Sequence, residues 1–253
     1  VESGVSIRAT GSITIDGVAE ACMLEAGKDI ILRGGMLGGN KASVKTKGAI
    51  TAKFFEFTNI LCEGDLQADV LMDCSVICHG QIRLTGRKGS IIGGKVQAIR
   101  GLIATSLGND AEKRTEIFVG AGIDVYSRLR VMEKKIEMTR EELAKIEEGL
   151  EKFEILSKER GVSYTNDPRR TSLLRIKIKD SAMLASDEEE VRKLRILAES
   201  SKGACVSVLQ EIYPGVIINM DELKLALKNM ATGVEFYKLP DKIGTRPCSA
   251  GVE

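Results

Sequence analysis

Residues 44–84 read VKTKGAITAKFFEFTNILCEGDLQADVLMDCSVICHGQIRL and contain three glycines at a spacing of 16 residues, Gly48, Gly64 and Gly80. On both sides of each glycine, apolar or small residues alternate with other residues and stand two and four positions away in every repeat. These positions are Val44, Thr46, Ile50 and Ala52 in the first repeat, Ile60, Cys62, Leu66 and Ala68 in the second, and Val76, Cys78, Ile82 and Leu84 in the third. Alternation with a period of two residues is typical of a strand with one buried face.

The repeat extends beyond this stretch in both directions. Further glycines at Gly11, Gly27 and Gly101 give successive steps of 16, 21, 16, 16 and 21 residues. Gly27 fits least well, because Glu25 and Asp29 stand where the other repeats have apolar residues. We expect each glycine to form a sharp corner, in a backbone conformation that other residues resist.

Short strands that repeat every 16 to 21 residues cannot each enclose a core. Stacked coils can, because neighbouring strands pair at about 4.8 Å and bury one continuous column of side chains. The pattern therefore predicts a right-handed parallel β-helix over residues 1–125, with the glycine-rich residues 33–40 bulging as a loop from one corner. A β-sandwich would need hairpin turns such as Asn-Gly or Asp-Gly between its strands, and only Asp16-Gly17 qualifies.

Residues 126–202 have the pattern of an antiparallel coiled-coil hairpin. The first helix has a heptad seam formed by Leu129, Met132, Ile136, Thr139, Leu143, Ile146, Leu150 and Phe153. Gly161 is expected to end it, and residues 163–168 (SYTNDP) to form a tip. A second helix is expected from about Thr171 to Ser200, with a less regular face formed by Leu173, Ile176, Met183, Leu184, Val191, Leu194 and Ala198. An intermolecular coiled coil is the alternative, but two seams on one chain with a tip between them favour the hairpin.

Residues 203–253 return to strand and are expected to cap the open end of the solenoid. Residues 204–209 (ACVSVL) and 233–237 (GVEFY) have strand composition, and Tyr213-Pro214-Gly215 predicts a turn. Residues 220–230 fit either a short helix or an irregular strand pair. An uncovered solenoid end exposes unpaired backbone groups, so a cap is expected on physical grounds. The predicted fold is mainly β with an α-helical insertion.

Composition argues against several functional classes. The net charge is +1 and aromatic residues make up 4% of the chain, with no Trp, so a nucleic-acid surface is not expected. No run approaches the roughly 18–20 apolar residues that span a bilayer, so we expect no membrane insertion. Six cysteines without a CxxC pair favour reduced thiols in a cytoplasmic protein. The chain begins at Val1 rather than Met, as a fragment of a longer protein would.

His79, the only histidine, is a candidate general base of the kind that solenoid acyltransferases use. Those enzymes have a hexapeptide repeat, so we prefer the interpretation of His79 as a corner residue beside Gly80. Cys74, Cys78 and His79 are the candidate metal ligands, but zinc usually takes four ligands and no second pair follows. Strand alternation places Cys78 inward, stacked on Cys62, and His79 outward. We therefore predict no metal, cofactor or catalytic residue here.

Two other candidate sites are weaker. Residues 86–90 (GRKGS) lack the spacing of a phosphate-binding loop and precede no helix, so we expect a solenoid corner. Asp65, Asp69 and Asp73 would matter in a polysaccharide-cleaving β-helix if their carboxylates converged. Acids spaced by four need not converge in strands and corners, so we expect solvated surface groups.

An ordered set of segments resembles the flagellar assembly protein A family over essentially the whole chain. The segments are residues 31–39 (ILRGGMLGG), 48–54 (GAITAKF), 89–98 (GSIIGGKVQA), 115–120 (TEIFVG), the long helical hairpin and residues 212–216 (IYPGV). The resemblance implies a β-solenoid split by a coiled coil, similar to the C-terminal domain of the septum-site cell-division inhibitor. It also implies a link to flagellar assembly or cell-surface organisation. One departure is residues 221–225 (DELKL), which read as more helical than the second strand that the family would place there.

These observations favour a non-enzymatic cytoplasmic scaffold that binds a protein partner through the hairpin or a solenoid face. Arg169-Arg170 at the hairpin tip are candidates for contact with an anionic partner, and a solvated tip is the simpler interpretation. A self-assembling solenoid polymer or another homo-oligomer is the first alternative. A β-helix enzyme acting on a carbohydrate or acyl donor is the second.

Overall fold

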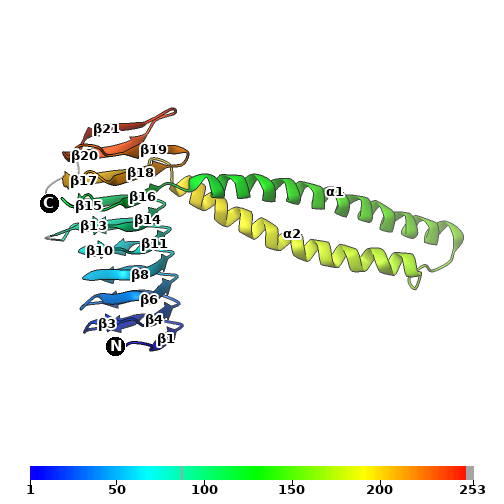
Figure 1. Ribbon diagram of the computed structural model, residues 1–253. Helices are drawn as coiled ribbons and strands as arrows, with labels where there is room; N and C mark the ends of the chain where they lie inside the picture. The colour runs from blue at the N-terminus through cyan, green and yellow to red at the C-terminus, as the bar shows by residue number, and fades with distance from the viewer. Residues whose placement is uncertain (87, 249–253) are drawn as a thin grey trace. The chain divides into compact units, whose positions relative to one another are not determined.

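The computed structural model describes residues 1–86 and 88–248, and most of these lie in a stack of short strands (Figure 1). Each turn of the stack contributes a strand to each of three faces. The first face contains β1 (Ser6–Ala9), β4 (Met23–Ala26), the second half of β6 (Met36–Thr46), the second half of β8 (Phe54–Cys62), β11 (Ser75–Cys78), β14 (Gly94–Ala98) and β16 (Thr115–Val119). The second contains β2 (Ile13–Ile15), β5 (Ile30–Leu32), β7 (Ile50–Ala52), β9 (Leu66–Gln67), β12 (Gln81–Leu84) and the start of β15 (Gly101–Leu107). The third contains β3 (Ala19–Glu20), the starts of β6 and β8, β10 (Val70–Met72), β13 (Ser90–Ile92) and the end of β15.

Every pairing between successive strands of a face is parallel, which confirms the predicted β-solenoid. It makes about six turns between residues 6 and 119. The inward side chains of each face stack in register. In the first face the stack consists of Leu24, Val44, Ile60, Val76, Val96 and Ile117, each at most 3% exposed. Burying an aliphatic side chain of this size contributes about 1.5–3 kcal/mol, so the stack provides most of the cohesion between coils.

The corner glycines of the central repeat lie directly above one another. The amide of Gly64 donates to the carbonyl of Gly48 at 2.9 Å, and the amide of Gly80 donates to that of Gly64 at 3.1 Å. None of the three has a positive φ, so the expectation of an unusual backbone conformation was wrong at these positions. Glycine is needed for space instead. A Cβ on Gly64 would lie 2.7 Å from the Gly48 oxygen, and one on Gly80 would lie 2.4 Å from the Gly64 oxygen.

The two glycines at the ends of the longer steps are displaced by one residue from the predicted stack. Lys28, not Gly27, stacks on Gly11, and Arg100, not Gly101, stacks on Gly80, as their amide hydrogen bonds to those glycine carbonyls show. Leu24 and Ala26 accordingly fill the inward positions next to Val44 and Thr46. Glu25 and Asp29 are exposed, which removes the misfit that the sequence spacing indicated.

A second correction concerns residues 33–40, predicted as a loop. Met36 begins β6 and is fully buried in the third face, and the extra residues appear as a register shift between Leu37 and Ala42. The corner that follows the third face has a left-handed residue in successive coils. These residues are Ala21 (φ 39°), Asn40 (φ 60°), Phe57 (φ 46°), Asp73 (φ 50°) and Gly93 (φ 71°). The conformational demand expected of the other glycines is thus met at this corner, mostly by residues other than glycine.

The helical hairpin consists of α1 (Gly122–Arg160) and α2 (Pro168–Ser200). All eight predicted seam residues of α1 are buried or half-buried, and Gly161 ends the helix with a left-handed φ of 64°. Cross-helix ion pairs between Arg128 and Glu190, Arg140 and Glu188, and Glu147 and Lys177 establish the antiparallel pairing. The predicted intrachain hairpin is therefore confirmed.

The seam of α2 differs from the predicted one. Ile176 and Met183 are exposed, by 42% and 38%, whereas Asp187 is 8% exposed. The buried or half-buried seam positions are Leu173, Lys177, Asp180, Leu184, Asp187, Val191, Leu194 and Ala198, which restores a strict alternation of three and four. The Nζ of Lys135 lies 2.7 Å from Oδ2 of Asp187, so α1 neutralises the charge placed in the seam.

The chain after the hairpin resumes the solenoid. β17 (Cys205–Ile212) pairs in parallel with β15, and β18 (Val216–Met220) pairs in parallel with β16. Three antiparallel strands follow: β19 (Leu223–Ala226) on β18, β20 (Ala231–Lys238) on β17 and β21 (Ile243–Pro247) on β20. Residues 221–225, which read as helical, form a tight turn with Asp221 at φ 52° and the start of β19. They therefore do not depart from the family pattern.

The chain divides into two compact units, one comprising Val1–Ile123 with Leu197 onward and the other Asp124–Ile196. Among the described residues, neither helix has an apolar stretch long enough to cross a membrane.

We predict that Gly64→Ala lowers the free energy of unfolding by about 1–3 kcal/mol, because its Cβ would enter the backbone of the coil below. Gly17→Ala is the matched control, since a Cβ there meets no atom within 4 Å. Denaturant unfolding measures both variants. Equal stability of the two would contradict the close stacking of the corner.

We predict that Asp187→Leu raises the thermal midpoint of the helical circular dichroism signal, because a well-packed apolar layer replaces a buried ion pair and Lys135 can reach solvent. Ser186→Leu, an exposed neighbour outside the seam, should leave the midpoint nearly unchanged. A lower midpoint for Asp187→Leu would show that the ion pair stabilises the hairpin more than apolar packing does.

Candidate functional surfaces

His79 lies half-buried at the corner after β11, where its backbone amide donates to the carbonyl of Cys62 at 2.9 Å. Within the described residues no hydrogen bond or ion pair reaches its imidazole ring. The ring therefore lacks the carboxylate partner that would orient a general base.

The two candidate cysteine ligands stand at opposite ends of β11. Cys78 is fully buried and in register with Cys62, as predicted, and its thiol lies 3.2 Å from the Gly64 carbonyl. Cys74 is buried at the other end, and burial raises the pKa of its thiol to about 11. Among residues 1–86 and 88–248, no three His, Cys, Asp or Glu side chains gather as a metal site would require.

The three aspartates lie at three different corners of a single coil, so their carboxylates do not converge. Asp65 accepts the amide of Gln81 at 2.8 Å and pairs with Arg100 at 2.5 Å. Asp69 lies against Gly86, and Asp73 pairs with Lys113. Each carboxylate thus contacts the coil that follows it, which is a structural role that the sequence interpretation as solvated acids did not include.

The remaining sequence candidates are also in structural positions. In residues 86–90, Arg87 lies outside the described residues, and Ser90 begins β13 rather than a helix. At the hairpin tip, Oδ1 of Asp167 accepts the amide of Arg169 at 2.8 Å, which caps the N-terminus of α2. Pro168 occupies the first helical position, for which its fixed φ is suited.

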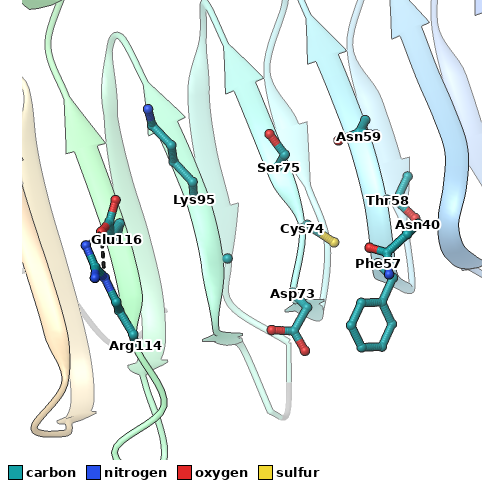
Figure 2. A pocket seen from close by; sticks show the side chains of 11 residues that line it. Asn40, Phe57, Thr58, Asn59, Asp73, Cys74, Ser75, Lys95, Arg114 and Glu116 are labelled. Carbon is teal, nitrogen blue, oxygen red and sulfur yellow. Dashed lines mark hydrogen bonds and ion pairs between the residues drawn. The ribbon is translucent and has the colours of Figure 1, made fainter.

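A shallow groove of about 380 Å³ follows the left-handed corner of the solenoid (Figure 2). Phe57 and Asp73 project from the corner on one side, and Ser75 and Lys95 project from adjacent strands of the first face on the other. Asn59, Ser75, Lys95 and Glu116 form a continuous outward ladder in register. The groove was not predicted, because its residues share a column only once the register of the longer steps is known.

The charged groups of this groove are engaged with neighbours. Glu116 pairs with Arg114, and the Nζ of Lys95 lies 4.5 Å from the centre of the Phe118 ring. Together with the Asp73–Lys113 pair, these contacts leave a polar groove without a free catalytic acid or base of its own.

The hairpin exposes more large apolar side chains than its length would suggest. Val131, Met138, Ile155, Ile178 and Ile196 are 68%, 55%, 54%, 71% and 62% exposed. Scattered exposed apolar residues are normal, but clustered ones mark interaction surfaces. A seam-only prediction missed them, although their positions outside the heptad a and d sites are visible in the sequence.

The protein-family comparison decides the relationship of the chain. The family model of the Flagellar Assembly Protein A beta solenoid domain matches residues 1–243. The chain belongs to this family. The order of solenoid, hairpin and returning strands agrees with the resemblance found in the sequence. No curated protein and no solved structure gives a significant match to the chain.

The buried thiols of this flagellar assembly protein A domain should resist modification. Burial raises the pKa of the Cys74, Cys22 and Cys205 thiols, so their reactive thiolate forms are scarce at about pH 8. We predict that a thiol reagent modifies the half-buried Cys248 first, and modifies Cys22, Cys62, Cys74 and Cys78 only after unfolding. Mass spectrometry of native protein, with Cys248→Ser as control, measures the order. Rapid native modification of Cys74 or Cys78 would contradict their structural role.

Proposed function

We propose that this domain is a non-catalytic cytoplasmic scaffold that holds protein partners together during flagellar assembly, with the helical hairpin as its protein-binding element. Membership of the flagellar assembly protein A family supports the link to flagellar assembly. The scaffold role and the assignment to the hairpin are inferred from how the hairpin is inserted.

The solenoid does not need the hairpin in order to stack. β15 precedes the insertion and β17 follows it, yet Leu102, Ile103 and Ala104 pair in register with Val206, Ser207 and Val208. Likewise, the whole of β16 pairs in register with β18. About seventy residues are therefore inserted at one corner without changing the pairing on either side of it. An insertion that the fold does not require is readily explained by a role outside the fold.

The surface of the hairpin supports binding to protein. Its exposed aliphatic residues lie outside the seam that joins α1 to α2, so they stabilise nothing within the described chain. The antiparallel strands β19, β20 and β21 favour a discrete scaffold over a polymer of stacked solenoids, because they cover the last parallel coil.

Affinity capture from a flagellated bacterium tests the proposal. The bait is this chain, compared with a version in which residues 126–196 are replaced by a short Gly-Ser linker. We predict that the linker version keeps the strand signal and thermal midpoint of the solenoid but loses flagellar assembly proteins captured by the intact chain.

A Ser43→Lys, Asn59→Lys double variant on the first face is the matched control and should capture the same proteins as the intact chain. Unchanged capture by the linker version would move partner binding to the solenoid. Capture of no flagellar protein by the intact chain would contradict the scaffold role itself.

A further inference from the structure

The heptad positions divide the surface of the hairpin into two flanks. In an antiparallel pair the e positions of the two helices meet on one side of the seam and the g positions on the other. The ion pairs Glu133–Arg195 and Arg140–Glu188 join e positions, and Arg128–Glu190 joins g positions. The c positions lie beside g, and the b positions lie beside e, so each flank spans both helices.

The g and c flank, here called the basic flank, has an apolar centre with lysines around it. Its exposed apolar residues are Val131, Met138, Ile176 and Met183. Its exposed lysines are Lys145, Lys152, Lys179 and Lys193. Within the described residues, the ion pairs of the hairpin involve none of these lysines, so their charges are available to an outside group.

The e and b flank, here called the acidic flank, has the opposite character. Its centre is small and apolar, with Ile178 71% exposed beside the exposed Ala144 and Ala185. Its exposed glutamates outside the ion pairs of the described residues are Glu137, Glu151 and Glu154. The two flanks thus present matching apolar centres with opposite charges around them.

We propose that the hairpin binds a second copy of this chain, with the basic flank of one hairpin packed side by side against the acidic flank of the other. This inference rests on the proposed scaffold role and names the chemistry of the partner. A second copy is favoured over an unrelated protein because the chain itself carries the complementary surface. Packing of two basic flanks is disfavoured, since it would place lysines against lysines.

The geometry has a consequence for assembly. A contact between two different flanks is heterologous, so each bound hairpin still offers one free flank to a further copy. The apolar centres supply burial, while the charges outside them select the partner flank and speed the encounter. Association should therefore grow with concentration and weaken as salt screens the exposed charges.

Reciprocal charge reversal of the full chain tests the inference. One variant carries Lys145→Glu and Lys179→Glu on the basic flank, and the other carries Glu137→Lys and Glu151→Lys on the acidic flank. Sedimentation velocity over a range of concentrations gives the mass of each. We expect concentration-dependent association of the wild type, monomers for either variant alone, and renewed association when the two variants are mixed.

A double reversal on the solenoid, Lys45→Glu with Lys47→Glu, is the matched control, because both lysines are exposed and the net charge changes equally. It should associate like the wild type. Circular dichroism checks that every variant keeps its helices. A wild type that stays monomeric at all concentrations, a basic-flank variant that associates like the wild type, or a mixture that stays monomeric would overturn the inference. Hairpin-dependent capture of flagellar proteins by a monomeric chain would leave the scaffold role standing and refute only the self-association.

Discussion

The in-register stacking of one coil on the next is the constraint on which the rest of the structure depends. A coil of about 16 residues has too little apolar surface to enclose a core alone, and it becomes stable only when its inward side chains lie on those of its neighbours. Glycine at a corner follows from the same constraint, since the backbones there approach too closely for a Cβ. The aspartates at the corners serve it too, because Asp29 and Asp65 each accept an amide of the following coil at 2.8 Å.

Stacking also explains where the chain can vary. A coil must keep its inward positions, but a corner can accept extra residues if the following strand returns to register. The register shift within β6 is a small example, and the hairpin between β16 and β17 is a large one. Freed from the demands of the core, the hairpin has its own seam, including the Lys135–Asp187 pair, and an outer surface with exposed aliphatic residues. That freedom makes it suited to contacts outside the chain.

The sequence predicted the architecture because the repeat was regular where it mattered. The 16-residue steps aligned Ile60 with Val76 and Cys62 with Cys78, and the structure has the same pairs. The longer steps were misjudged by one residue at Gly27 and Gly101, since a glycine beside a corner looks the same in sequence as a glycine within it. In α2, charged residues at seam positions misled the prediction, because Asp187 is buried only with a partner supplied by the other helix. The groove at Phe57 and the two flanks of the hairpin depend on register across distant segments, which residue spacing alone does not provide.

Disulfide trapping across the insertion tests most directly whether the stack continues past the hairpin. Glu116 and Ile217 are predicted to be neighbours in register on β16 and β18, and paired strands about 4.8 Å apart fall within the range that a disulfide can bridge. In a background with Cys205 and Cys248 changed to serine, Glu116→Cys with Ile217→Cys should form an intrachain disulfide under mild oxidation, whereas Glu116→Cys with Asn219→Cys should not. Preferential crosslinking of the second pair, or of neither, would show that the coils on the two sides of the hairpin are not stacked as described.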